Sequence, residues 1–262
     1  MYLLVQAHQF EKFSHLIDQS FLLRKRVFAD RLGWKVAVSG EMEKDLYDTL
    51  NPAYLFWCDD EGKRLYGTVR LLPTTGPTLL YDVFRTTFPN SCDLVAPTIW
   101  EGTRMCIDED AISCDMPELR PDQAFCQLLL ALCEVALDHG IETLVSNYEP
   151  HLKRLYERAG AELEELGRAT GFGRFPVCCG MFEVSPRILR QMRTKLEVSE
   201  PLYRRSYPTR RQTGQPTARG ERLSERLQAD FGEIQSDQAD QVQSRSLVMA
   251  SWPSPGSSTI NP

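Results

Sequence analysis

The chain has 262 residues, of which 42% are hydrophobic and 25% are charged, and its formal net charge is −6. No apolar run reaches the length of about 18 residues that a transmembrane helix requires. The N-terminus also lacks the basic segment and the small-residue cleavage site of a signal peptide. We therefore expect a globular, cytoplasmic protein without a membrane span.

The composition changes near Pro201, after which the chain is rich in Gln, Ser, Arg and Pro. This pattern predicts one domain over residues 1–200 and a disordered C-terminal tail over 201–262. The tail carries a net charge of +2, which leaves −8 on the body and argues against a nucleic-acid partner. The eight cysteines show no C-x-x-C spacing and lie mostly in apolar runs, so we expect reduced thiols and no metal site.

The first hundred residues alternate between strand-like and helix-like apolar patterns. Residues 10–32 have apolar residues at helical spacing, and Gly62 suits the turn between two apolar runs. The patterns predict a strand over 1–7, a helix over 10–32, an irregular polar segment over 35–50, a hairpin over 53–73 and a strand over 98–107.

The clearest helix of the second half covers residues 120–139, which carry a wide apolar face and are followed by Gly140 as a stop signal. The rest predicts a strand over 143–147, a helix over 150–160, strands over 161–168 and 175–184, and a helix over 186–196. This order indicates an α/β domain with a central mixed sheet and helices on its faces. We expect it to be a monomer.

Several charged residues interrupt apolar or structured segments. Arg70 stands inside a strand pattern, Arg24 lies on the first helix, and Asp45 and Asp48 lie in the polar segment that follows it. Buried charges must be paired. Each of these residues, taken alone, is more often part of a structural ion pair than a catalytic group.

Glu101 and Arg104 lie three residues apart on one predicted strand, "WEGTRMCID". Strict alternation places them on opposite faces of the sheet. A β-bulge at Gly102 would bring both side chains to the same face. The alternative is that the two residues form a core salt bridge with each other.

The order and spacing of these residues resemble the signature of the LuxI-type acyl-homoserine lactone synthases, the bacterial autoinducer synthases. The resemblance covers residues 1–190 and includes the stretches "FADRLGW", "RLLPTTGPTLL" and "LYERAG". The stretches "WEGTRMCID" and "PVCCGMFEVS" resemble the rhizobial members that make long-chain signals. The residues that carry the signature are Arg24, Phe28, Trp34, Asp45, Asp48, Arg70, Glu101 and Arg104.

The resemblance implies a three-layer fold similar to the GNAT acetyltransferases, with a mixed, mostly antiparallel sheet. In the family, the amine of S-adenosylmethionine (SAM) attacks the thioester of an acyl-acyl-carrier protein. The methionyl carboxylate then displaces methylthioadenosine and closes the lactone. SAM is therefore a substrate, and we expect no cofactor.

Glu101 is the best candidate for the general base that deprotonates the amine. The backbone N–H of Met105 or Cys106 is a candidate oxyanion donor, and the Cys106 thiol itself is more consistent with the core than with a nucleophile. The arginines either bind carboxylates or hold the acids in place. We assign catalysis to Glu101, Arg104, Asp45, Asp48 and Arg70, and SAM binding to Arg24, Phe28 and Trp34, whose rings suit a sulfonium and an adenine.

The acyl chain is expected to contact Thr103, Met105, Ser146 and Tyr148. Many relatives have a serine at the position of Thr103 and an aromatic residue at that of Met105. Strand alternation places Ser146 and Tyr148 on one face, where the Ser146 hydroxyl suits a 3-oxo or 3-hydroxy group. The alternative for Ser146 is a hydrogen bond to a neighbouring carbonyl.

An acidic carrier protein needs a basic docking patch, for which the candidates are Lys153, Arg154 and Arg158. An ordinary solvated helix face explains these three residues equally well. Two other functions remain open: a GNAT enzyme that uses acyl-CoA, and a non-catalytic binder of acyl chains or carrier protein. The chain lacks the R/Q-x-x-G-x-G/A turn that holds the CoA pyrophosphate, and it keeps every charged position of the signature.

Overall fold

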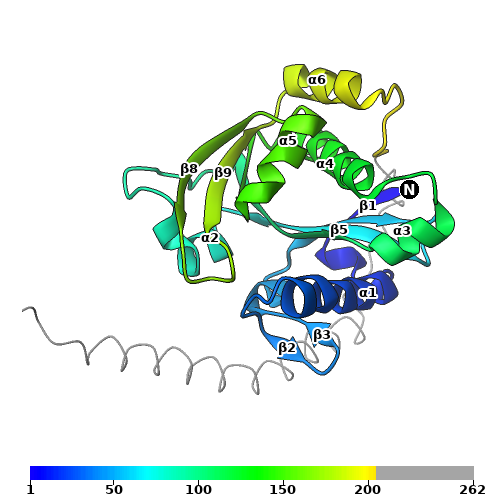
Figure 1. Ribbon diagram of the computed structural model, residues 1–262, viewed down its shortest axis with the longest axis horizontal. Helices are drawn as coiled ribbons and strands as arrows, with labels where there is room; N and C mark the ends of the chain where they lie inside the picture. Colours follow the sequence, from blue (N-terminus) through cyan, green and yellow to red (C-terminus); the bar gives the residue numbers. More distant parts are fainter. Residues whose placement is uncertain (205–262) are drawn as a thin grey trace, which may run out of the picture. The chain divides into compact units, whose positions relative to one another are not determined.

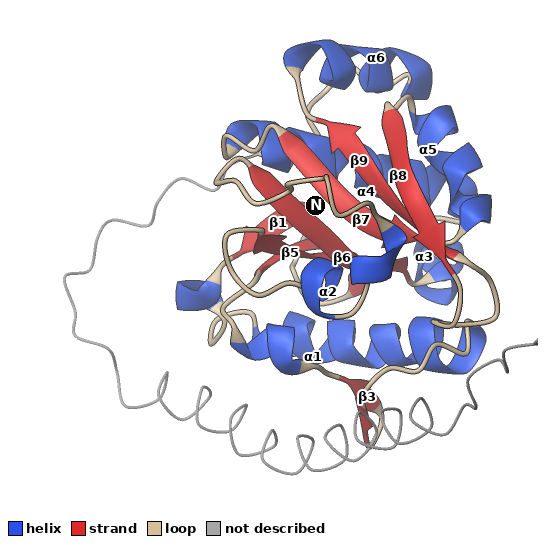
Figure 2. Ribbon diagram, turned by 90° about the vertical axis from the view of Figure 1, so that its left-hand side faces the viewer, coloured by secondary structure: helices blue, strands red, loops and turns tan. Residues whose placement is uncertain are grey.

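A computed structural model describes residues 1–204 of the chain, and the expected tail from residue 205 onward lies outside the described residues. Seven strands form one sheet in the order β1-β4-β5-β6-β7-β9-β8 (Figures 1 and 2). Only β6 and β7 run parallel. The strands are β1 (Tyr2–Val5), β4 (Ala53–Cys58), β5 (Leu65–Pro73), β6 (Ile99–Ile107), β7 (Thr143–Tyr148), β8 (Leu163–Ala169) and β9 (Val177–Glu183), with a separate small pair β2 (Val38–Ser39) and β3 (Met42–Glu43).

Helices cover both faces of the sheet. Figure 1 shows α1 on one face and α4 and α5 on the other, with α6 packed outside α4. No helix within residues 1–204 is long and apolar enough to cross a membrane. The helices are α1 (Ser14–Arg24), α2 (Leu79–Asp82), α3 (Glu109–Asp115), α4 (Pro121–Asp138), α5 (Lys153–Ala159) and α6 (Pro186–Leu196), with the short turns η1 (Ala7–Gln9), η3 (Leu46–Thr49), η4 (Arg85–Thr87) and η5 (Pro150–Leu152) and the π-helix η2 (Lys25–Arg31).

The predicted three-layer arrangement with a mixed, mostly antiparallel sheet is confirmed, as are the hairpin, the strand over 98–107 and the helix over 186–196. The helix predicted over residues 10–32 is divided instead. It is α-helical to Arg24 and then widens into the π-helix η2. The segment over 35–50 is less irregular than predicted, because it contains β2, β3 and η3. The two short helices α2 and α3 were not predicted.

Strand alternation separates an apolar face from a polar one. On β4, Leu55 and Trp57 pack in the core beneath α4. Tyr54, which precedes Leu55 in the chain, points to the opposite face, where its hydroxyl donates to Asp48 Oδ1 at 2.7 Å. On β5 the same alternation buries Val69 and Leu71 under α4 and sends Arg70 to the α1 face.

Strands β6 and β7 separate part-way along their length. They are paired only from Ile99 and Thr143 to Glu101 and Val145, although both strands continue further. Beyond that point the Ser146 hydroxyl donates to the Gly102 carbonyl at 2.8 Å. A side chain thus replaces the next rung of the ladder, and the β7-facing edge of β6 is open beside Glu101.

The chain remains attached to the body past the predicted boundary at residue 200. Leu202 and Tyr203 pack against the core beneath α4. The Tyr203 N–H donates to Oε2 of the buried Glu134 at 2.7 Å, and Arg193 holds the other oxygen of Glu134 at 2.9 Å. Residues 201–204 therefore contribute to the domain.

We predict that a chain ending at Arg204 keeps the thermal midpoint and the activity of the full chain, because the composition beyond it is too polar to add a core. A chain ending at Glu200 should melt about 5 °C lower, since the buried Glu134 loses its Tyr203 donor. Differential scanning calorimetry of the two truncated chains makes the comparison. Equal midpoints would show that residues 201–204 add no stability.

Candidate active site

Six buried charged side chains from five elements converge on the α1 face of the sheet. Arg24 ends α1, Glu43 lies on β3, Asp45 and Asp48 flank the start of η3, and β5 and β6 supply the remaining two. All six are less than 10% exposed. We call this set the ion cluster: Arg24, Arg70, Arg104, Glu43, Asp45 and Asp48.

The ion cluster is a continuous network of ion pairs. Arg24 grips Asp48 with two parallel hydrogen bonds of 2.8 and 2.9 Å and donates to Glu43 at 2.5 Å. Arg70 grips Asp45 in the same bidentate way at 2.5 and 2.9 Å and reaches Asp48 at 2.8 Å. Arg104 joins Glu43 at 2.9 Å to Asp45 at 3.0 Å. The arginines therefore hold the acids in place, and the three positive charges balance the three negative ones.

The pKa values follow from this pairing. Burial alone would raise the pKa of Asp48, but the adjacent Arg24 and Arg70 outweigh burial and hold it well below its usual value. Burial would likewise lower the pKa of Arg70, and Asp45 and Asp48 instead raise it. Asp48 and Arg70 therefore stay ionised across the physiological pH range.

Glu101 stands beside the ion cluster without joining it. The residue is fully buried, and no described side chain donates a hydrogen bond to its carboxylate. Burial raises its pKa to about 7, against the opposing effects of the Arg70 charge, of the Leu79 and Leu80 N–H groups at the start of α2, and of Arg104. The alternative of a Glu101–Arg104 salt bridge is wrong, because Arg104 pairs with Glu43 and Asp45.

A β-bulge does bring Glu101 and Arg104 to one face, but it lies at Arg104 and not at Gly102. Between the pairs Arg70–Thr103 and Thr68–Cys106, one residue of β5 faces two of β6. Arg104 takes the left-handed conformation there, with φ of +54°. A non-glycine residue in that conformation costs roughly 1 kcal/mol. The bulge thereby places Arg104 on the same face as Thr103, whose hydroxyl accepts from Arg70 Nε at 3.0 Å.

Two aromatic rings border the cluster. The Arg104 guanidinium lies over the buried Phe28 ring, 5.4 Å from its centroid. The Phe28 and Trp34 rings are 5.7 Å apart. Trp34 is only partly buried, and its Nε1–H donates to Glu149 Oε1 at 2.7 Å. The structure thus brings both predicted SAM-binding rings to one place beside Arg104.

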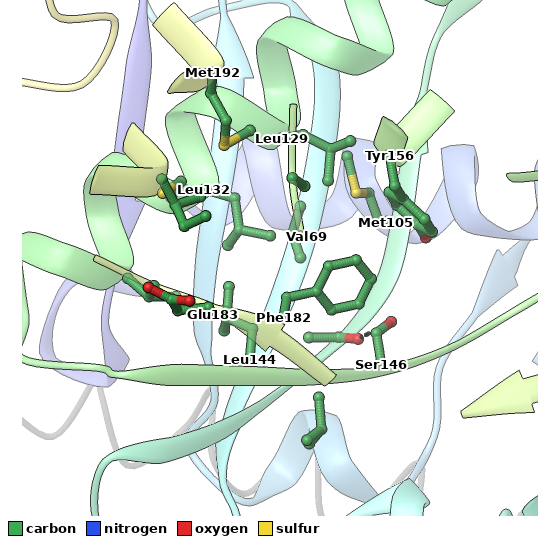
Figure 3. Close-up of a pocket in the computed structure, with 16 residues that line it drawn as sticks. Val69, Met105, Leu129, Leu132, Leu144, Ser146, Tyr156, Phe182, Glu183 and Met192 are labelled. Carbon is green, nitrogen blue, oxygen red and sulfur yellow. Dashed lines mark hydrogen bonds between the residues drawn. The ribbon is translucent and has the colours of Figure 1, made fainter. Parts of the chain in front are cut away.

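An apolar cavity lies on the opposite face of the sheet, under α4 (Figure 3). Val69, Leu144 and Phe182 line it from the sheet and Leu129 lines it from α4. Met105 and Ser146 also line it. The space open to water-sized molecules is about 50 Å³, room for a few waters. Any longer occupant must therefore displace the flexible side chains of its wall.

Comparison with known proteins identifies the chain. A sequence model of the autoinducer synthase family matches residues 8–192. The acyl-homoserine-lactone synthase of Rhizobium etli is 39% identical over 181 residues, which cover 68% of this chain and 82% of that protein. The synthase of Agrobacterium fabrum is 31% identical over 172 residues, covering 65% of this chain and 80% of that protein. The chain belongs to the autoinducer synthase family. It is an acyltransferase, an acyl-homoserine-lactone synthase.

Solved structures agree on the fold of the synthase. The crystal structure of the AHL synthase LasI matches with a TM-score of 0.63 at 26% identity, covering 75% of this chain and 93% of that one. The structure of BjaI, described as a CoA-dependent acyl-homoserine lactone synthase with SAM and isopentyl-CoA, matches with a TM-score of 0.67 and covers 86% of this chain and 98% of that one. At 21% identity, the likeness to BjaI shows the fold of the chain.

Among the predicted acyl contacts, the structure brings only Met105 and Ser146 of the synthase to the cavity. Thr103 lies on the charged face instead, held by Arg70. Tyr148 packs edge-on against Tyr156, which itself lines the cavity. The Ser146 hydroxyl donates to the Gly102 carbonyl, the alternative raised from the sequence, and it still faces the cavity.

The predicted docking residues Lys153, Arg154 and Arg158 are all exposed on α5. Arg158 forms an ion pair with Asp122 at the start of α4, which reduces its availability to a partner. Lys153 and Arg154 form no ion pair with a described residue. Among residues 1–204 no group of His, Cys, Asp and Glu side chains is arranged to hold a metal ion.

Sequence reasoning missed Glu43, the acid that links Arg24 to Arg104. One available signal was charge balance. The signature has three arginines, and only Asp45 and Asp48 remain as acidic partners once Glu101 is assigned to catalysis. Glu43 lies two residues before Asp45 in "EMEKD", so an extended segment places both side chains on one side.

We predict that Arg104→Ala lowers the free energy of unfolding of the synthase by about 3–5 kcal/mol, because it leaves Glu43 and Asp45 buried with one partner fewer. Arg104→Gly should lower the free energy of unfolding by about 1 kcal/mol less than Arg104→Ala does, since glycine adopts the left-handed conformation without strain. Urea denaturation measures both. Arg31→Ala, which breaks an exposed pair with Glu109, is the control and should cost under about 1 kcal/mol. An Arg104→Ala loss no larger than that control would contradict the role of the pair.

Proposed function

We propose that this synthase transfers an acyl chain from acyl-acyl-carrier protein to the amine of SAM and then closes the lactone with release of methylthioadenosine. The observation that carries the proposal is the buried Glu101 carboxylate, which is paired with no described side chain and whose pKa burial raises to about 7. A solved relative described with SAM supports the choice of amine substrate.

Glu101 acts as the general base of the acylation step. The ammonium group of SAM must lose a proton before its nitrogen can attack a thioester. A carboxylate with a pKa near 7 is a much stronger base than one near its ordinary value of 4.5, and it is still ionised in a large fraction of molecules at neutral pH. The amine nitrogen then bonds to the thioester carbon, the thiolate leaves, and a proton passes to the sulfur.

Arg104 is the proposed contact for the methionyl carboxylate. Its Nε and Nη2 are engaged with the ion cluster, whereas no described residue accepts a hydrogen bond from Nη1. The amine and the carboxylate of SAM are attached to one carbon, so the groups that recognise them must be neighbours. The bulge provides this by aiming Glu101 and Arg104 at the same face.

Lactone closure follows from the same binding mode. A carboxylate oxygen of the acylated methionyl group attacks the γ-carbon, the carbon–sulfur bond breaks, and its electron pair neutralises the sulfonium. Phe28 and Trp34 are proposed to hold the sulfonium and adenine by cation–π contact and stacking. The N–H of Met105 or Cys106, beside the open edge of β6, is the proposed oxyanion donor for the first step.

The acyl chain is proposed to enter the cavity under α4 through the opening between β6 and β7. Met105 and Met192 line the cavity and are flexible enough to make room for a long chain. The Ser146 proton is committed to the Gly102 carbonyl. The hydroxyl is therefore better suited to accept from a 3-hydroxy group than to donate to a 3-oxo group.

The carrier protein is favoured over CoA as acyl donor by the helix that follows β6. The first turn of α3 carries Glu109 and Asp110, and the Asp108 side chain already accepts from the Ala111 N–H. An acidic helix start of this kind repels a pyrophosphate. Lys153 and Arg154, which form no ion pair with a described residue, suit an acidic carrier protein. The second candidate, acyl-CoA as donor, is favoured by the CoA-dependent relatives of known structure.

We predict that Glu101→Gln reduces kcat/KM by roughly 10²-fold or more while the protein remains folded, because the amide cannot accept the proton. In the wild-type synthase kcat/KM should rise with pH through about 7, as the carboxylate loses its proton. Initial rates of methylthioadenosine release measure both effects. Near-wild-type turnover by purified Glu101→Gln would remove Glu101 from the mechanism.

We also predict that the Lys153→Glu/Arg154→Glu double variant lowers the ratio of kcat/KM for acyl-carrier protein to that for acyl-CoA at least tenfold, since charge reversal opposes an acidic partner. Rates with the two donors of equal chain length give the ratio. Lys63→Glu, at the exposed turn between β4 and β5, is the control. A ratio unchanged by the double variant, together with faster wild-type turnover of acyl-CoA, would establish the second candidate.

A further inference from the structure

Glu149 is a buried carboxylate that the mechanism above does not use. It follows directly after β7 and is only 2% exposed. Its Oε1 accepts from the Trp34 indole Nε1–H at 2.7 Å, across 115 residues of sequence. This hydrogen bond ties the end of β7 to the loop after η2.

The one hydrogen bond that the Glu149 side chain accepts from a described residue does little to offset the cost of burying it. Removing a carboxylate from water is unfavourable unless charges and donors compensate for it. The indole N–H is neutral. Oε2 is buried and accepts no hydrogen bond from a described residue, and the imidazole Nδ1 of the largely exposed His151 lies 3.5 Å from it. Because these contacts compensate so little for its burial, the presence of Glu149 is better explained by its effect on Trp34 than by a contribution to stability.

The rest of Trp34 is already fixed. Its backbone N–H donates to the Phe28 carbonyl at 2.8 Å. Its ring contacts Phe28 and Phe84, with centroids 5.7 and 6.2 Å away. Gly173 approaches so closely that a Cβ there would lie 3.0 Å from the indole Cδ1. The hydrogen bond to Glu149 fixes the remaining polar edge and so determines which way the indole faces.

We propose that Glu149 is a positioning residue of the SAM site. It holds the Trp34 indole in the orientation that meets the substrate, so that the ring does not have to be ordered when SAM binds. The proposal rests on the role given to Trp34 under the proposed function. It assigns Glu149 no contact with the reacting atoms, so its removal should affect SAM binding more than chemistry.

Two substitutions separate the hydrogen bond from the charge. Glu149→Gln keeps an oxygen that can accept from the indole, whereas Glu149→Leu keeps the bulk and removes every acceptor. We expect Glu149→Leu to raise the KM for SAM about tenfold with kcat within about twofold of wild type, and Glu149→Gln to stay within about threefold in both. Glu164→Gln, which removes an exposed carboxylate from β8, is the control for charge.

The indole N–H resonance of Trp34 in a 15N–1H spectrum, assigned by its loss in Trp34→Phe, gives a readout that a general loss of stability does not move. It should lie downfield before SAM is added, keep that position in Glu149→Gln and move upfield in Glu149→Leu. If the wild-type resonance moves downfield only when SAM is added, the indole is not held in advance and the proposal is overturned. This measurement needs no variant of Glu149 to fold.

The KM values for SAM distinguish a failure of the positioning role of Glu149 from a failure of the role given to Trp34. If Trp34→Phe raises the KM for SAM but Glu149→Leu does not, the positioning role is overturned and the role of Trp34 stands. If Trp34→Phe leaves that KM unchanged, the role given to Trp34 fails and the proposal fails with it. In the Trp34→Phe background, Glu149→Leu should add no more than about a twofold change.

Discussion

Three buried arginines and three buried acids pair with one another completely, and the rest of the site depends on that closure. Each arginine bridges at least two acids, so no positive charge in the ion cluster is left without a partner. If one of the acids were missing, an arginine would be free to pair with Glu101 and would lower its pKa. Because the set is balanced, no arginine among the described residues forms an ion pair with Glu101, and burial brings its pKa to about 7.

The same network fixes the backbone around the site. It joins α1, β3, η3, β5 and β6, of which only β5 and β6 are neighbours in the sheet. Two departures from regular structure lie beside it: the π-helix η2, which carries Phe28, and the left-handed Arg104 in the bulge of β6. Such departures cost free energy and persist where surrounding contacts hold them. Here the buried ion pairs of Arg104 hold the bulge, and its guanidinium lies over the Phe28 ring of η2.

The sequence alone predicted the layers, the hairpin and most of the charged residues, because these depend on local pattern. Arg70 in an apolar strand could be recognised as a buried charge without knowledge of its partner. The partners of the arginines depend on the path of residues 35–50, a segment without a periodic signal. Glu43 was therefore missed, and a salt bridge between Glu101 and Arg104 was left open as an alternative. The bulge was assigned to Gly102 on conformational preference, whereas ion pairing stabilises it at Arg104. Thr103 was expected to contact the acyl chain, but the strand register turns it to the charged face, where Arg70 donates to its hydroxyl.

The most direct test of this account is the titration of Glu101 itself. The side-chain carboxyl carbons of 13C-glutamate-labelled synthase can be followed by NMR against pH, with Glu101 assigned by the signal that Glu101→Gln lacks. A carboxylate left unpaired by a closed ion cluster should titrate with a midpoint near 7 in the free enzyme. A midpoint at or below the ordinary value of 4.5 would show that Glu101 is paired or solvated, and would contradict the account.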